Sequence, residues 1–264
     1  DDEESVESAN RNRTAARRPV YPQRPVYCIQ PRRWCERPRQ WPRPGDGNVS
    51  FVSFNMQGRG GTPQGMAMIE GIMQALQRPI LFLQDVTQID PTREPAGDSV
   101  ALFAGLLTHT RYRAFWADNA EQRNGSKYKA GRGAAVLVPL ETAAVDDGFP
   151  MALEKNRRFT NLDVALVLLP QLDLFVASVY AHPKKLRARR FTALSKRLPR
   201  RKVIIGGDFN FEMRNMEDKM LDKMLNDGWT GIPPSEPTTA NRGLDGFFAK
   251  PGAPVIKACW PQNR

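Results

Sequence analysis

The sequence predicts an α/β (α+β) fold, a four-layer sandwich in which two mixed β-sheets pack face to face between outer helices. Two observations lead to this prediction. Strand and helix patterns alternate near both ends of the main body of the chain, and strand patterns follow one another directly in its middle. The 264 residues, 41% of them hydrophobic, are enough for one substantial core. No stretch reaches the roughly 18 apolar residues of a membrane-spanning helix, so no membrane span is predicted.

The individual elements follow from their periodicity. Apolar and polar residues alternate as in a strand over residues 49–55, and an amphipathic helix is expected over 63–77. Residues 99–118 predict a helix followed by a strand, and Lys184 to Leu198 a basic helix. Further strands are expected over 78–86, 131–140, 162–170, 172–183, 201–210 and 244–250, with a turn near Pro170 and a second late helix over 216–227.

Residues 1–46 predict an Arg- and Pro-rich extension, which leaves residues 47–264 as the folded domain. Seven prolines between Pro19 and Pro44 exclude a regular helix there. Its aromatic residues either pack against the body or, interleaved with arginines, contact single-stranded nucleic acid. Because the extension lacks apolar periodicity, we expect its deletion to leave the melting temperature within a few degrees.

The net charge of +11 is concentrated in two zones. Residues 11–44 hold ten Arg and one Glu, and residues 184–202 hold ten Lys or Arg and no acid. Two basic zones on an otherwise acidic body indicate contact with a polyanion, and DNA is the partner we expect. The alternative is a solubilising tail and one solvated helix face.

Polar residues stand where several predicted strands end. All are hard oxygen donors, which favour Mg²⁺ (or Mn²⁺ or Ca²⁺) over zinc, and the chain has only two histidines. If these strands share one sheet, their ends converge on one rim, and a buried carboxylate there gains a cation as its partner. The residues are Asn55, Asp85, Asp208, Asn210 and Asp245. Each one alone is more typical of a turn or a helix cap, and only the set of five favours a site.

The motifs around these residues resemble the endonuclease/exonuclease/phosphatase superfamily, which includes deoxyribonuclease I and the nuclease subunit of cytolethal distending toxins. "GGDFNFE" resembles the family's G-D-F-N motif, and "FLQDV" its L-Q-E strand with Asp85 in place of Glu. "SFNMQG" resembles the toxin's first strand, and "NGSKYKAGRGAAVLVP" the entry to the nuclease's middle strands. "NRRF" is similar to the phosphate-contacting stretch and points to Arg158, and "PTTANRGLDGFF" points to Asp245. The resemblance covers residues 49 to 256 in consistent order.

The resemblance implies metal-dependent hydrolysis of a phosphoester. In family terms, Asp208 orients the attacking water, Asn210 and Arg158 contact the phosphate, and Asp245 supports the catalytic centre. Asn55, Asp85 and Asp208 form the implied metal site.

The histidine machinery of the family is altered in this chain. Tyr180 stands where the family has a histidine, and His182 follows two residues later, on the same strand face but about 6.5 Å away. The partner carboxylate has no counterpart, and no Asp-His pair follows Asp245. Either Tyr180, His182 or a lysine serves in catalysis, or Tyr180 packs and His182 caps the basic helix.

The leading interpretation is a Mg²⁺-dependent endonuclease that hydrolyses DNA phosphodiester bonds, as a component of a secreted toxin with partner subunits. Removal of a secretory signal is one explanation of a start at Asp1, and the site of action would then be a host nucleus. Alternatives are a catalytically impaired module that binds nucleic acid or a partner protein, and a phosphoinositide phosphatase. A Cys28–Cys35 disulfide is one pairing that the three cysteines allow.

Overall fold

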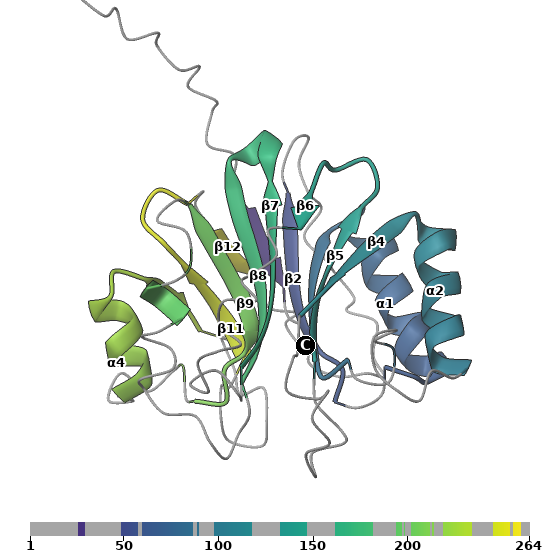
Figure 1. The fold of residues 1–264 in the computed structure, drawn as a ribbon, viewed down its shortest axis with the longest axis horizontal. Coiled ribbons are helices and arrows are strands. Elements are labelled where there is room, and N and C mark those ends of the chain that lie inside the picture. The colour runs from purple at the N-terminus through teal and green to yellow at the C-terminus, as the bar shows by residue number, and fades with distance from the viewer. Residues whose placement is uncertain are drawn as a thin grey trace, which may run out of the picture.

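The chain folds into two face-to-face sheets between two layers of helices, as the sequence predicts (Figure 1). Helices α1 (Pro63–Ala75) and α2 (Asp98–Thr110) cover one sheet, and α4 (Lys219–Asn226) covers the other. The computed structural model describes residues 26–29, 49–57, 60–86, 89, 98–117, 133–146, 162–181, 194–196, 198, 202–211, 213, 219–233, 245–253 and 256–259. Within them, no helix is long and apolar enough to cross a membrane.

The first sheet is mixed. Its first four strands run parallel to one another, and the last two add antiparallel pairs. The strand order is β12 (Ile256–Cys259), β1 (Val26–Ile29), β2 (Ser50–Asn55), β3 (Ile80–Gln84), β5 (Ala134–Pro139) and β4 (Tyr112–Trp116).

The second sheet has one parallel pair, β8 with β9, and is otherwise antiparallel. The predicted turn near Pro170 is confirmed as a short 3₁₀ turn, Pro170–Leu172, between β7 and β8. The strand order is β10 (Thr230–Ile232), β11 (Asp245–Ala249), β9 (Val203–Asp208), β8 (Leu174–Ala181), β7 (Leu162–Leu169) and β6 (Val145–Asp146).

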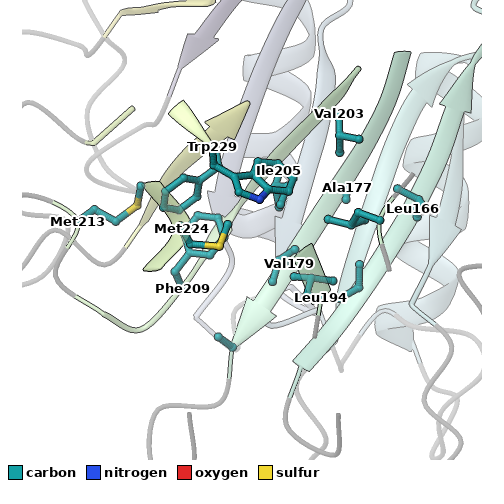
Figure 2. Close-up of a cluster of buried hydrophobic side chains, with 14 of the residues drawn as sticks. Leu166, Ala177, Val179, Leu194, Val203, Ile205, Phe209, Met213, Met224 and Trp229 are labelled. Atoms are coloured by element: carbon teal, nitrogen blue, oxygen red, sulfur yellow. The ribbon is translucent and has the colours of Figure 1, made fainter. Parts of the chain in front are cut away.

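Alternation along the strands divides the core into three clusters, one between each pair of layers. On β9, Ile204 faces the other sheet, whereas Ile205 faces α4. The α4-side cluster also contains Trp229 and Met224, as Figure 2 shows. The third cluster lies between the first sheet and α1 with α2. Strand residues of even number on β8 and β9 therefore point into the space between the sheets.

Helix α1 has the start that its sequence favours. Pro63 occupies its first turn, and the Thr62 hydroxyl accepts a hydrogen bond from the Gly65 N–H at 3.1 Å. Met66, Ile69 and Ile72 are buried against the first sheet. The predicted amphipathic helix is thus confirmed, to within two residues at its end.

One expectation about the extension is corrected. Val26–Ile29 form β1, an interior strand that pairs with both β2 and β12, so the extension does not lie wholly outside the fold. Prolines at 25 and 31 bracket a segment too short for a periodic signal, and tertiary pairing decides its structure. The boundary at residue 46 stays a prediction, but the expected tolerance to deletion no longer follows. The rest of the extension lies outside the described residues.

The predicted basic helix is described only at its end. Residues 194–196 form a helical turn, and Leu194 and Leu198 are buried under the second sheet. The Ser195 hydroxyl accepts a hydrogen bond from Trp229 Nε1 at 2.8 Å. The segment that leaves β8 at Ala181 is therefore fixed to the body again at this turn.

Candidate active site

Strand β9 ends at Asp208 on the face between the two sheets, directly after two glycines. A Cβ added to Gly206 would lie 2.4 Å from the Phe82 ring of the opposite sheet. A Cβ on Gly207 would lie 2.0 Å from the Val179 carbonyl oxygen on β8. Close packing of a ring and of a neighbouring strand therefore explains both glycines. These contacts bring the end of β9 close to its neighbours.

Asp208 is held by two hydrogen bonds from residues near strand ends. The Asn55 Nδ2 group donates to Oδ2 at 2.7 Å, and the backbone N–H of Asn210 donates to Oδ1 at 3.0 Å. The first of these bonds joins the two sheets, because Asn55 ends β2. The polar residues at the ends of β2 and β9 thus converge on one rim, as the sequence predicts, but their strands lie in two facing sheets and not in one shared sheet.

Two further carboxylates, Asp245 and Asp85, act on Asp208. Asp245 begins β11 directly opposite Asp208, and both side chains are only 6% exposed. Asp85 follows β3 and is half-buried. Burial raises the pKa of Asp208 well above its ordinary value, and the charges of Asp245 and Asp85 raise it further. The hydrogen bonds from Asn210 and Asn55 oppose that shift without cancelling it.

Backbone conformation redirects the chain at this rim. Gln57, Asp85 and Asn210, which follow β2, β3 and β9, have positive φ values of 48°, 56° and 52°. Asn and Asp tolerate the left-handed region better than most residues, yet it costs free energy outside glycine. Three such turns beside one carboxylate cluster are typical of a functional site.

The two amide side chains are engaged in orienting contacts. Asn55 Oδ1 accepts the Gln57 N–H at 2.9 Å, so both ends of this amide are used. Asn210 Nδ2 donates to the carbonyl oxygen of Ala181 and ties the end of β9 to the end of β8. An amide NH₂ group cannot ligate a cation. In this arrangement Asn55 therefore orients Asp208, and its predicted part in a metal site stays a prediction.

Tyr180 lies beside Asp208 but within the core. Its side chain is 2% exposed and belongs to the cluster between the sheets. The register pairs it with Asp208 on one side and with Asp163 of β7 on the other. Asp163 was not predicted as a site residue, because it lies within an apolar strand and only the strand register shows that it is paired with Tyr180. His182 and Arg158 lie outside the described residues.

The donor set is of a kind that suits a hard divalent cation. Two buried carboxylates and a third nearby repel one another, and a cation would offset that repulsion. Within the described part of the chain, no three acidic, histidine or cysteine side chains are placed to hold an ion by themselves. Mg²⁺ commonly takes one or two carboxylates together with waters and substrate phosphate oxygens, whereas Ca²⁺ needs more protein ligands.

Comparisons with known proteins identify the fold. No family model matches the chain, and no curated protein matches it. Among solved structures, it is similar to an endonuclease/exonuclease/phosphatase family protein from Leptotrichia buccalis C-1013-b, with 15% identity and a TM-score of 0.50 over 73% of this chain and 83% of that one. A protein of the same family from Bacteroides thetaiotaomicron gives 11% identity and a TM-score of 0.49 over 76% and 80%.

A third similar structure is the endonuclease domain of TRAS1, a telomere-specific non-LTR retrotransposon. It shares 15% identity with this chain and gives a TM-score of 0.47, over 75% of this chain and 82% of that one. At these identities the similarity concerns the fold alone. The chain has the fold of the endonuclease/exonuclease/phosphatase superfamily, the deoxyribonuclease I-like sandwich that the motifs predict.

Proposed function

We propose that the protein is a Mg²⁺-dependent phosphoesterase and, more specifically, an endonuclease that hydrolyses DNA phosphodiester bonds. The observation that carries this proposal is the convergence of Asp208, Asp245 and Asp85 at one rim, with Asn55 bonded to Asp208. A chain that needs only a stable core has no use for buried, mutually repelling carboxylates.

Asp85, Asp208 and Asn55 have defined parts in the proposed reaction. Asp85 and Asp208 would hold the ion, which supplies charge stabilisation at the phosphate oxygens when bound. Asp208 Oδ1 or Oδ2 accepts a proton from the attacking water while the water oxygen forms its bond to phosphorus. Asn55 keeps Asp208 in that orientation. The bond from phosphorus to the leaving oxygen breaks, and that oxygen takes a proton from a general acid, for which Tyr180 and His182 are the candidates.

Nucleic acid is the proposed substrate because of charge. The segment of residues 184–202, with ten basic residues, begins just after β8 ends at Ala181, and Asn210 bonds to the Ala181 carbonyl at the rim. Phosphate groups drawn to this segment would arrive beside the carboxylates. The toxin role, the partner toxin subunits and secretion stay predictions from the resemblance.

The proposed function is tested by plasmid nicking in Mg²⁺. We expect conversion of supercoiled to open-circular DNA by the wild type, and none with EDTA or with Asp208→Ala. Substitution of Arg189, Arg190 and Arg197 by Glu should flatten the dependence of log affinity on log salt by about 2.7, if each contacts one phosphate of duplex DNA. Nicking that survives in EDTA would contradict the proposal.

A second candidate function is a catalytically impaired module that binds nucleic acid or a partner protein. Tyr180 favours it, since a phenol buried to 2% exposure reaches a leaving oxygen less readily than the histidine expected there. This candidate would be supported over the enzyme if the protein bound both metal and DNA tightly in Mg²⁺ but did not nick the DNA.

A further inference from the structure

A polar contact between the sheets lies one layer below the proposed site. Gln84, the last residue of β3, and Ser178 of β8 are both fully buried. Gln84 Nε2 donates to Ser178 Oγ at 3.1 Å, and Ser178 Oγ donates to the Leu83 carbonyl at 2.8 Å. These bonds reach from one sheet to the other. They are directional, in contrast to the apolar packing around them.

Gln84 is also connected within its own sheet. Its Nε2 group donates to the Phe82 carbonyl at 2.9 Å, and its Oε1 accepts the Ser53 hydroxyl at 3.4 Å. The amide is therefore satisfied on both of its ends although it is shielded from water. A buried group with this many partners has one preferred geometry, and departures from it cost free energy.

The register places this contact directly under the carboxylates. Gln84 pairs with Asn55 across the sheet and is followed in the chain by Asp85. Ser178 pairs with Gly206, and one strand period further on Tyr180 pairs with Asp208. Each half of the proposed metal site is thus attached to one partner of the contact. A shift of the Gln84–Ser178 pair would move Asp85 relative to Asp208.

We propose that Gln84 and Ser178 form a positioning bridge, which fixes the spacing between the two sheets so that Asn55 and Asp85 meet Asp208 in the geometry that binds Mg²⁺. Apolar layers alone tolerate small sliding movements, and a site divided between two sheets does not. This inference rests on the proposed function where it concerns the cation, and on the structure alone where it concerns the bond between Asn55 and Asp208.

The bridge is tested in the full chain with Gln84→Met, Ser178→Ala and the double variant, and with Mn²⁺ alone as the probe. We expect each single variant to weaken Mn²⁺ affinity about 10-fold, as residues that support metal ligands do. The double variant should lose little more than either single one, because both remove the same contact. The matched control is Val176→Ala, one strand period further from the rim on the same face of β8. It should lower the melting temperature and leave Mn²⁺ affinity within twofold.

A second readout does not require a cation. In NMR spectra the side-chain amide protons of Asn55 should be protected from exchange in the wild type and in Val176→Ala. They should lose at least tenfold of that protection in both bridge variants. Wild-type protein that binds no Mn²⁺ would contradict the proposed function, and the Asn55 signals would then decide the bridge by themselves. The bridge would be overturned if Ser178→Ala left the Asn55 protection unchanged and the Mn²⁺ affinity within twofold of wild type. This criterion needs Ser178→Ala alone, so it also holds if Gln84→Met fails to fold.

Discussion

Asp208 and Asp245 on the second sheet are each 6% exposed, whereas Asn55 and Asp85 on the first sheet are half-buried. The second sheet holds charge in a shielded place, where each carboxylate raises the free energy of its neighbour. The first sheet supplies a neutral amide donor and a more solvated acid at the end of β3. Reactivity would therefore come from the buried carboxylates Asp208 and Asp245, and orientation from Asn55 on the facing sheet.

Asp208→Asn should have the largest effect on this comparison. The variant keeps the shape of the side chain and removes the base, so we expect Mg²⁺-dependent phosphodiester hydrolysis to fall by about 1,000-fold. Initial rates of plasmid nicking measure it. Asp222→Asn, the same change on the exposed part of α4, should retain wild-type rates. Equal rates in Asp208→Asn and wild type would show that Asp208 takes no part in catalysis.

Deletion of residues 1–44 tests whether the first sheet depends on β1. The strand is interior, paired with both β2 and β12, so its loss leaves β2 as an open edge. We expect the melting temperature to fall by roughly 10 °C or more, where each kcal/mol corresponds to about 2–4 °C. Deletion of residues 1–24, which retains β1, is the control and should change it by little. A shift of a few degrees for both would restore the view of a dispensable extension.

Much of this architecture could be predicted from periodicity, and the exceptions have two causes, short strands and contacts that only the packing of the sheets decides. The polar residues at strand ends were sufficient to predict a shared rim, but the face-to-face packing of the two sheets, and not strand direction within one sheet, brings Asn55 to Asp208. Strands β6 and β10 have two and three residues, too few to show a period. The Gln84–Ser178 contact joins residues 94 positions apart on different sheets, and only the packing of the sheets decides it.

Asn55→Ala separates orientation from charge. Removal of the Nδ2 donor frees Asp208 to rotate, so we expect kcat to fall about 10- to 100-fold while the fold persists. Steady-state hydrolysis and circular dichroism together measure this. The matched control is Asn226→Ala, which removes an exposed amide at the end of α4. If Asn55→Ala retains full activity, the first sheet does not orient the base.

The smallest expected effect is the pH dependence of stability. Because burial and like charges raise the pKa of Asp208 in the folded state, its ionisation opposes folding. Without a divalent ion, the protonated Asp208 therefore does not lower the free energy of unfolding below pH about 4. The free energy of unfolding then decreases as the pH rises through the raised pKa of Asp208. Mg²⁺ should raise the melting temperature by a few degrees at neutral pH and hardly at pH 4. Differential scanning fluorimetry measures these shifts. A larger Mg²⁺-induced shift at pH 4 than at neutral pH would contradict the prediction.

The proposed cation site is divided between the two sheets, and titration calorimetry of Mn²⁺ binding tests this division. One acid from each sheet is replaced, in Asp85→Ala and in Asp208→Asn. The divided site predicts that wild type binds one Mn²⁺ and that each variant weakens this binding at least 10-fold. Mn²⁺ affinity that is the same in wild type and in both variants would contradict it.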